Sequence, residues 1–130
     1  MKSIIKIIVK IIISKLPVPY SFWKLIGLFK HGKMDSCEYA IKIFNLHYLR
    51  AFKKNEKRNI TILELGPGDS IASALIGFSY GASKIFLIDV DNFASKNINF
   101  YKKLSEKLRS LKLTPPNLEK AKSIKDILNS

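Results

Sequence analysis

The sequence predicts an α/β fold built on one strand, turn, helix, strand unit between residues 59 and 91. Two apolar runs of strand length, residues 60–65 and 85–88, enclose a stretch with apolar residues at helical spacing. A glycine-rich turn directly follows the first run. Such units bind ligands at the carboxyl ends of their strands, beside the turn, so a functional site is expected there.

The length and composition allow one small folded core. The 130 residues are 47% hydrophobic, which weighs against wholesale disorder. We expect an N-terminal part, residues 1–34, with an amphipathic helix and an aromatic packing segment, followed by a partial α/β domain over residues 35–130. The single cysteine, Cys37, excludes an internal disulfide and a CxxC metal framework. A reducing, cytoplasmic setting fits this composition, and no metal is expected.

The basic charge lies outside the glycine-rich unit. The formal net charge is +13, yet residues 60–99 carry 2 Lys/Arg against 4 Asp/Glu. Residues 1–59 carry 13 Lys/Arg against 3 Asp/Glu, and residues 100–130 carry 8 Lys/Arg against 3 Asp/Glu. Because the candidate site region is acidic, nucleic acid is not the expected partner.

Residues 1–16 predict a helix with one narrow polar stripe, formed by Lys2, Lys6, Lys10 and Ser14. The lysines interrupt every apolar run, which argues against a span of about 20 apolar residues and against a signal-peptide core of roughly 7 or more. Two interpretations stay open. The helix lies in a membrane interface, at the inner face of the membrane, or it docks on the rest of the protein or on a second copy.

The elements before residue 59 are predicted from helix-capping residues and from the spacing of apolar residues. Two prolines end the first helix, and the aromatic-rich residues 20–29 are expected to cover the main domain. Asp35 and Glu38 fit a capping box that begins a helix over residues 36–54. His47 is interpreted as a packed residue of this helix rather than as a general base, and the same holds for His31 in its turn. The inward face is expected to be Ala40, Ile43, Phe44, His47 and Ala51.

Three more helices follow along the chain. Gly81 can close the helix after the glycine turn, Asp91 or Asn92 can cap the next one, and Asn117 can cap the last. No third strand is visible, and a parallel pair needs neighbours and cover on both faces, so the sheet is expected to be incomplete. The apolar positions of the three helices are Ile71, Ala74, Leu75 and Phe78; Ile98, Tyr101, Leu104, Leu108 and Leu111; and Ala121, Ile124 and Leu128.

The neighbours of the turn at residues 66–68 narrow the class of ligand. Glycines let the backbone approach a ligand, and the next helix starts with free amide donors. A P-loop needs Gly-Lys-Ser/Thr, whereas this turn continues with Asp69 and Ser70. A dinucleotide fingerprint needs a third small residue where Ile71 stands, and two carboxylates near its pyrophosphate would each cost about 1 kcal/mol.

A ligand with positive charge and free hydroxyls suits these carboxylates better. S-adenosyl-L-methionine carries a sulfonium, an α-ammonium and a ribose diol. Asp89 lies 23 residues beyond Gly66 and can accept both ribose hydroxyls, and Glu64 can face the methionine end. Alternatively, the two acids only cap nearby helices, and Asp69 or Ser70 serves only as the N-cap of the following helix.

The run Glu64-Leu65-Gly66-Pro67-Gly68 resembles the first motif of class I S-adenosylmethionine-dependent methyltransferases, and Leu87-Ile88-Asp89 resembles their second-strand acid. The wider sequence over residues 16–111 is similar to a bacterial subgroup of these enzymes. The resemblance implies a Rossmann-like methyltransferase fold, present here as the first βαβα portion after N-terminal helices. Ser70 stands where many members have a third glycine. The expected cofactor-binding residues are Glu64, Gly66, Pro67, Gly68, Asp69, Ser70 and Asp89.

The resemblance also implies a reaction, methyl transfer by in-line attack on the sulfonium methyl. The protein would orient and desolvate the reactants, which lowers the activation barrier by roughly 7–11 kcal/mol. Family members place adenine and substrate contacts on later strands, so we expect the N-terminal part of a methyltransferase, with the methyl acceptor and the catalytic base unknown. The alternative is a non-catalytic membrane-surface or interaction protein that uses the helix of residues 1–16 and keeps the βαβ unit as a scaffold.

Overall fold

The computed structural model divides the chain into two compact units, Met1–Lys30 and His31–Ser130. It describes residues 36–52 and 59–129, together with five separate positions near the N-terminus, Ile4, Ile8, Ile11, Lys15 and Pro17.

In the first unit, Ile4, Ile8 and Ile11 have helical backbone and expose 50–63% of their side chains. No helix within the described residues is long and apolar enough to cross a membrane. The predicted lysine stripe, the aromatic segment of residues 20–29, His31 and the capping residue Asp35 lie outside the described residues.

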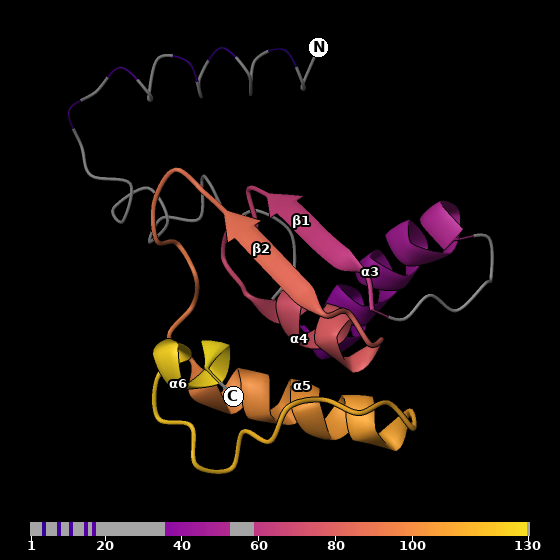
Figure 1. Cartoon of the computed structure of the whole chain (residues 1–130). Helices are drawn as coiled ribbons and strands as arrows, with labels where there is room; N and C mark the ends of the chain where they lie inside the picture. Colours follow the sequence, from indigo (N-terminus) through magenta and orange to yellow (C-terminus); the bar gives the residue numbers. More distant parts are fainter. Residues whose placement is uncertain are drawn as a thin grey trace. The chain divides into compact units, whose positions relative to one another are not determined.

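The described part of the second unit has four helices and a two-stranded parallel sheet (Figure 1), so the α/β class is confirmed. Both strands fall where the apolar runs predicted them, and along each strand the residues alternate between a half-buried, helix-covered face and an exposed, open face. The elements are α3 (Cys37–Phe52), β1 (Thr61–Leu65), α4 (Ala72–Ser79), β2 (Lys84–Ile88), α5 (Ile98–Ser110) and α6 (Ile124–Leu128).

Helix α4 approaches the sheet closely at Gly77. A Cβ atom on this glycine would lie 2.8 Å from Ile62 Cδ1 and 3.2 Å from Ile85 Cδ1. Ile62 and Ile85 are partners in the parallel register, which runs from Thr61 opposite Lys84 to Leu65 opposite Ile88. Ile62 and Ile85 therefore mark the helix-covered face of each strand.

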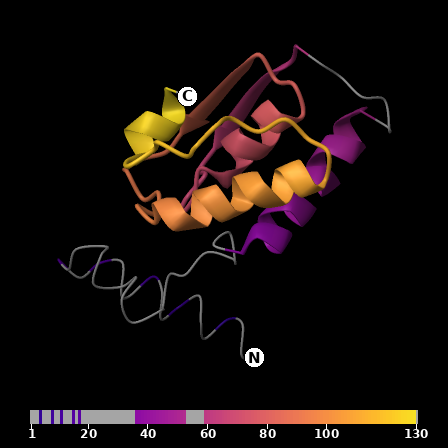
Figure 2. The same cartoon turned by 90° about the horizontal axis from the view of Figure 1, so that it is seen from below.

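Helices α3 and α5 lie on the same side of the strands as α4 (Figures 1 and 2). Tyr80 joins α4 to α3, because its hydroxyl donates to Asn45 Oδ1 at 2.7 Å and its ring packs 4.8 Å from the Tyr48 ring, between centroids. The core lies among these helices. Its buried members are Ala40, Ile41, Ile71, Ala72, Leu75, Ile76, Phe100, Tyr101, Leu104, Leu108, Leu118, Ala121 and Ile127.

The segment after α5 returns along that helix. Ser105 Oγ donates to the Pro116 carbonyl at 3.1 Å, and Lys102 Nζ donates to the Glu119 carbonyl at 2.9 Å. Leu118 is 2% exposed, so this loop contributes to the core although it contains two prolines and no strand.

Glycine closes α4 as the sequence predicted. Gly81 has φ 85°, its amide donates to Phe78 O at 2.8 Å, and the Ala82 amide donates to Gly77 O at 3.1 Å. These two bonds form a Schellman motif, which satisfies the last carbonyls of the helix.

Two of the predicted N-caps, those of α5 and α6, were displaced by five or six residues. Ser36 Oγ accepts from the Tyr39 amide at the start of α3. Asn97, rather than Asp91 or Asn92, caps α5. Ser123 and Asp126 form a capping box on α6, whereas Asn117 accepts from the Glu119 amide in the preceding turn. Several Asn, Asp and Ser residues precede each helix, and only tertiary packing selects among them.

The predicted inward face of α3 is correct in part. Ala40 is buried and Phe44 packs against the core, whereas His47 and Ala51 are exposed. Ile41 and Tyr48, which were not predicted, are also buried. Phe78 of α4 and Leu111 after α5 are also about half exposed, at 47% and 49%. Helical spacing identifies apolar faces but not which part of them a neighbouring element covers.

Candidate functional site

The turn at residues 66–68 has the backbone that only glycine adopts readily. Gly66 has φ 69° and Gly68 has φ 65°, in the left-handed region that costs other residues roughly 1–2 kcal/mol. The Gly66 amide donates to Ile88 O at 2.8 Å, which holds the turn beside the end of β2. No atom lies within 4 Å of a Cβ built on Gly66, so a ligand can approach this backbone.

Asp89 lies at the carboxyl end of β2 and holds the turn in place. Its Oδ2 accepts from the Gly68 amide at 2.9 Å, and its Oδ1 accepts from the Val90 amide at 2.7 Å. A carboxylate has about four acceptor positions, so one on each oxygen stays available for further donors. The acid predicted for the ribose thus lies directly beside the glycine turn.

Glu64, the second predicted acid, is half-buried on the helix-covered side of β1. Its Oε2 accepts a hydrogen bond from Ser73 Oγ in the first turn of α4. Sequence reasoning missed Ser73. The available signal was its position in the first turn of α4, because the start of a helix that follows a tight turn lies near the end of the preceding strand.

Ser70 and Asp69 each make a hydrogen bond within the protein. Ser70 is 2% exposed, and its Oγ accepts from the Ala72 amide at 3.0 Å, so its side chain supports the first turn of α4 instead of facing a ligand. Ile71 occupies the N-cap position and has no side-chain cap bond. The carbonyl of Asp69 accepts from the Ser95 amide at 2.9 Å, which joins the turn to the loop after β2.

Tyr101 of α5 is a further residue that the sequence did not single out for the site. It is fully buried, its hydroxyl donates to the Ser95 carbonyl at 2.9 Å, and it accepts from the Ile71 amide at 3.4 Å. The tyrosine therefore connects α5 to both loops that form the candidate site.

A cleft of about 520 Å³ runs between α3 and β1. Its lining is mostly apolar and includes Phe44 and Tyr48 from α3. The polar residues Glu64 and Ser73 also line this cleft. His47 also lines it and is exposed, so it lies on the cleft surface and not in the packed interior that was predicted.

Cys37, at the first position of α3, has the character of a packed thiol. Burial raises the pKa of Cys37, and the Glu38 carboxylate raises it further, against smaller opposing effects of Lys103 and Lys107. A raised pKa disfavours the thiolate, which is the nucleophilic form. Within the described part of the chain, no three His, Cys, Asp or Glu side chains are grouped to hold a metal ion.

Comparison with known protein families, with curated proteins and with solved structures finds no match to this chain.

Proposed function

We propose that the glycine turn and the strand-end acids bind S-adenosyl-L-methionine, and that the chain carries the methionine and ribose half of a methyltransferase site. One observation carries the proposal: the Gly68 amide and the Asp89 carboxylate meet at 2.9 Å at the carboxyl ends of two parallel strands. Ligands of doubly wound α/β folds bind at this end of the sheet.

The donors and acceptors present fit this cofactor better than a phosphate ligand. Asp89 keeps acceptor capacity for ribose hydroxyls, and Glu64 adds a second carboxylate near the end of β1. The open side of Gly66 allows the methionine portion to lie against the backbone. Neither Lys nor Arg occurs between residues 59 and 83, so the turn has no local cation for a diphosphate.

Asp89 would orient the ribose, the turn would position the methionine portion, and Glu64 would attract its positive charge. When bound, the cofactor supplies an electrophilic methyl group on sulfur. The open face of the sheet supports the incomplete-fold interpretation, because the helices of this half all cover one face. Further polypeptide would have to supply the acceptor and adenine contacts.

The test is a titration of the ¹⁵N-labelled chain with S-adenosyl-L-methionine, followed by NMR. Amide shifts are expected to cluster at residues 64–70 and 89–91, even if affinity is only millimolar. NAD and ATP serve as matched ligands that share the adenosine group but carry phosphates. Larger shifts of these amides with NAD or ATP, or no shift at all with millimolar S-adenosyl-L-methionine, would contradict the proposal.

A second candidate function rests on the N-terminal unit. Ile4, Ile8 and Ile11 expose 63%, 50% and 55% of their surface on helical backbone. An exposed apolar row on a helix whose sequence also carries lysines is typical of a helix in a membrane interface. Co-sedimentation with anionic vesicles, with and without residues 1–16, tests this candidate, since binding that persists without them would remove it.

A further inference from the structure

The cleft between α3 and β1 runs along one edge of the sheet. Every residue from Ile60 to Leu65 lines it, although successive side chains of a strand point to opposite faces. Within the described part of the chain, no residue of β2 lines it. The cleft therefore lies beside the main chain of β1, at the edge away from β2, which we call the free edge.

Hydrogen bonds at both ends of β1 show which main-chain groups point to β2. At the start of the strand, Ile60 O accepts from the Ser83 amide at 2.9 Å. After its end, the Gly66 amide donates to Ile88 O at 2.8 Å. Because main-chain groups alternate in direction along a strand, the even-numbered residues of β1 face β2 and the odd-numbered residues face the free edge.

Three residues thus direct a main-chain N–H and C=O into the cleft, namely Thr61, Leu63 and Leu65. All three are exposed, and none of these outward groups bonds another residue that the structure describes. The described sheet has two strands, so β1 has no neighbour on this side. A row of unpaired main-chain donors and acceptors is a template for another strand.

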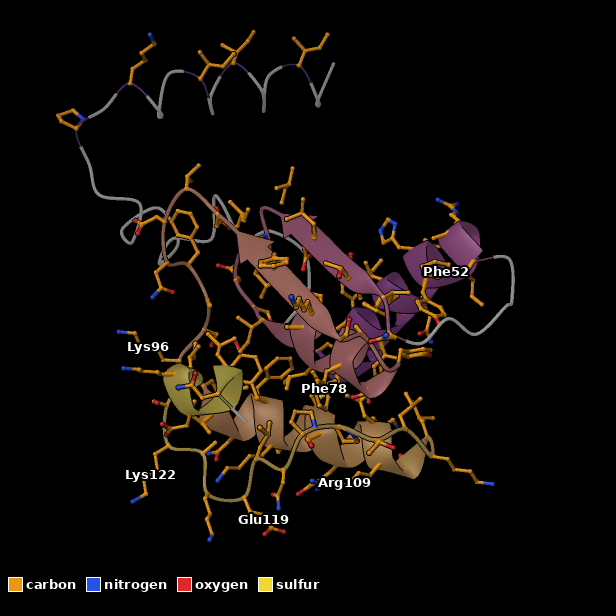
Figure 3. All side chains as sticks on the ribbon, in the orientation of Figure 1. Phe52, Phe78, Lys96, Arg109, Glu119 and Lys122 are labelled. Atoms are coloured by element: carbon orange, nitrogen blue, oxygen red, sulfur yellow. The ribbon has the colours of Figure 1, made fainter. Side chains whose placement is uncertain are left out.

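The opposite wall of the cleft is one face of α3. Along it lies a row of residues four positions apart, which we call the aromatic stripe: Ala40, Phe44, Tyr48 and Phe52. The Tyr48 ring lies 6.0 Å from the Phe44 ring and 4.9 Å from the Phe52 ring, between centroids. Phe52 ends the stripe in the last turn of α3 (Figure 3). The stripe offers an apolar surface along the whole length of β1.

Charge in the cleft is acidic, although the whole chain has a formal net charge of +13. Among its described lining residues, Glu64 is the one Asp, Glu, Lys or Arg. Other charged side chains, such as Arg109, Glu119 and Lys122, lie around α5 and the segment after it, away from β1 (Figure 3). The cleft therefore complements an apolar partner that carries a basic group and not an acidic one.

We propose that the cleft binds an extended apolar segment of a separate polypeptide, which adds a third strand to the sheet at β1. The main chain of this segment pairs with Thr61, Leu63 and Leu65, and its alternate side chains pack on the aromatic stripe. Donors and acceptors that repeat every second residue, about 6.6–6.8 Å apart, match an extended polypeptide better than a compact small molecule. A basic side chain of the segment lies near Glu64.

The test is an NMR titration of the ¹⁵N-labelled full chain with a synthetic peptide of about seven residues, a usual strand length. Its core alternates valine and threonine, and a lysine stands at each end. A matched peptide carries N-methyl groups on every core residue, which keeps the side chains and removes the main-chain donors. We expect the first peptide to slow hydrogen exchange at Thr61, Leu63 and Leu65, and the N-methylated peptide to bind at least about tenfold more weakly.

A third peptide, with glutamate in place of both lysines, tests the charge. We expect it to bind at least about threefold more weakly than the lysine peptide, because it places a carboxylate near Glu64. Glu64→Gln should remove this difference between the two peptides. A preference for the glutamate peptide would contradict the basic partner.

Two variants at one position test the pairing from the side of the protein. Leu63→Pro removes an outward donor but no bond to β2, and proline is tolerated on edge strands. Leu63→Ala is the matched control, because it shortens the same side chain and keeps the N–H. We expect Leu63→Pro to bind the lysine peptide at least about fivefold more weakly than Leu63→Ala. Circular dichroism establishes that each variant is folded, and the N-methylated peptide tests the same pairing on the unchanged chain.

Several results would overturn the proposal. These are no binding of the lysine peptide at about 2 mM, equal binding of the N-methylated peptide, or amide shifts confined to α5. Slow exchange of the Leu63 amide in the chain alone would show that another part of the same chain pairs with the free edge. Concentration-dependent shifts of β1 without peptide would show that a second copy does so, and either result would also overturn the proposal.

Discussion

The Gly68 amide donates a hydrogen bond to Asp89 Oδ2 at 2.9 Å, across 21 residues of sequence. This bond fixes the turn after β1 against the end of β2. It gives Asp89 a role in the unbound protein that is independent of any ligand, so substitutions there should affect both stability and binding.

Asp89→Ala is expected to lower the free energy of unfolding by about 1–3 kcal/mol, because the partly buried Gly68 amide loses its acceptor. Asp89→Asn keeps an acceptor oxygen, so its loss of unfolding free energy should be smaller. Urea denaturation measures both effects. Asp91→Ala is the matched control, since the Asp91 carboxylate accepts from the exposed Asn92 amide, and an equal loss of stability in this control would contradict the role of the Gly68 bond.

Gly77→Ala tests the close approach of α4 to the sheet. Alanine is about 1 kcal/mol better than glycine in a helix, but here its methyl would lie 2.8 Å from Ile62 Cδ1. Overpacking costs about 1–3 kcal/mol, but both contacting atoms are the ends of isoleucine side chains that can shift. We therefore expect the helix gain to be cancelled, with a net destabilisation of about 0–1 kcal/mol in thermal or urea unfolding.

The companion variant Ile62→Val removes the Cδ1 atom that the new methyl would meet. The double variant Gly77→Ala/Ile62→Val should lose less unfolding free energy than the two single variants added together. We expect the difference to be at least about 0.5 kcal/mol. Strict additivity would show that the contact between α4 and β1 does not require glycine.

Tyr101→Phe should destabilise the protein by about 1–3 kcal/mol, because the buried Ile71 amide and the part-buried Ser95 carbonyl both lose a partner. Hydrogen exchange should rise most at Ile71 and Ala72. Tyr39→Phe, on the exposed side of α3, is the control and should leave unfolding unchanged within about 0.5 kcal/mol.

The capping box of α6 predicts a pH dependence. The amide of Lys122, and next Ser123, hold the pKa of Asp126 below its ordinary range. A lowered folded-state pKa contributes stability above the unfolded value, near 3.9, and that stability is lost as the pH falls through the lowered pKa. Asp126→Asn should thus have a lower Tm than the wild type at pH 6, with a smaller difference near pH 2.

Ser123→Ala separates this charge effect from the cap itself. It removes the acceptor for the Asp126 amide but keeps the carboxylate, so its Tm should be reduced at both pH values. A Tm difference for Asp126→Asn that stays constant from pH 6 to pH 2 would contradict the assignment.

The sequence by itself determined the order of elements and the turn. Apolar runs of strand length beside a glycine turn predict strands from local sequence, and Gly66, Gly68 and Gly81 adopt the left-handed backbone that few other residues accept. The position of Asp89 at a strand end follows from the same local rules.

Only the tertiary structure decided which polar residues cap helices or are buried, and which apolar residues are exposed. Ser70 is buried against α4, Asn97 and Ser123 cap helices in place of earlier candidates, and His47 lies on a cleft surface. Local spacing could not reveal that Tyr101 joins two loops or that the sheet has an open face. Those relationships depend on how helices pack over two strands, and packing is a property of contacts between residues far apart in the chain.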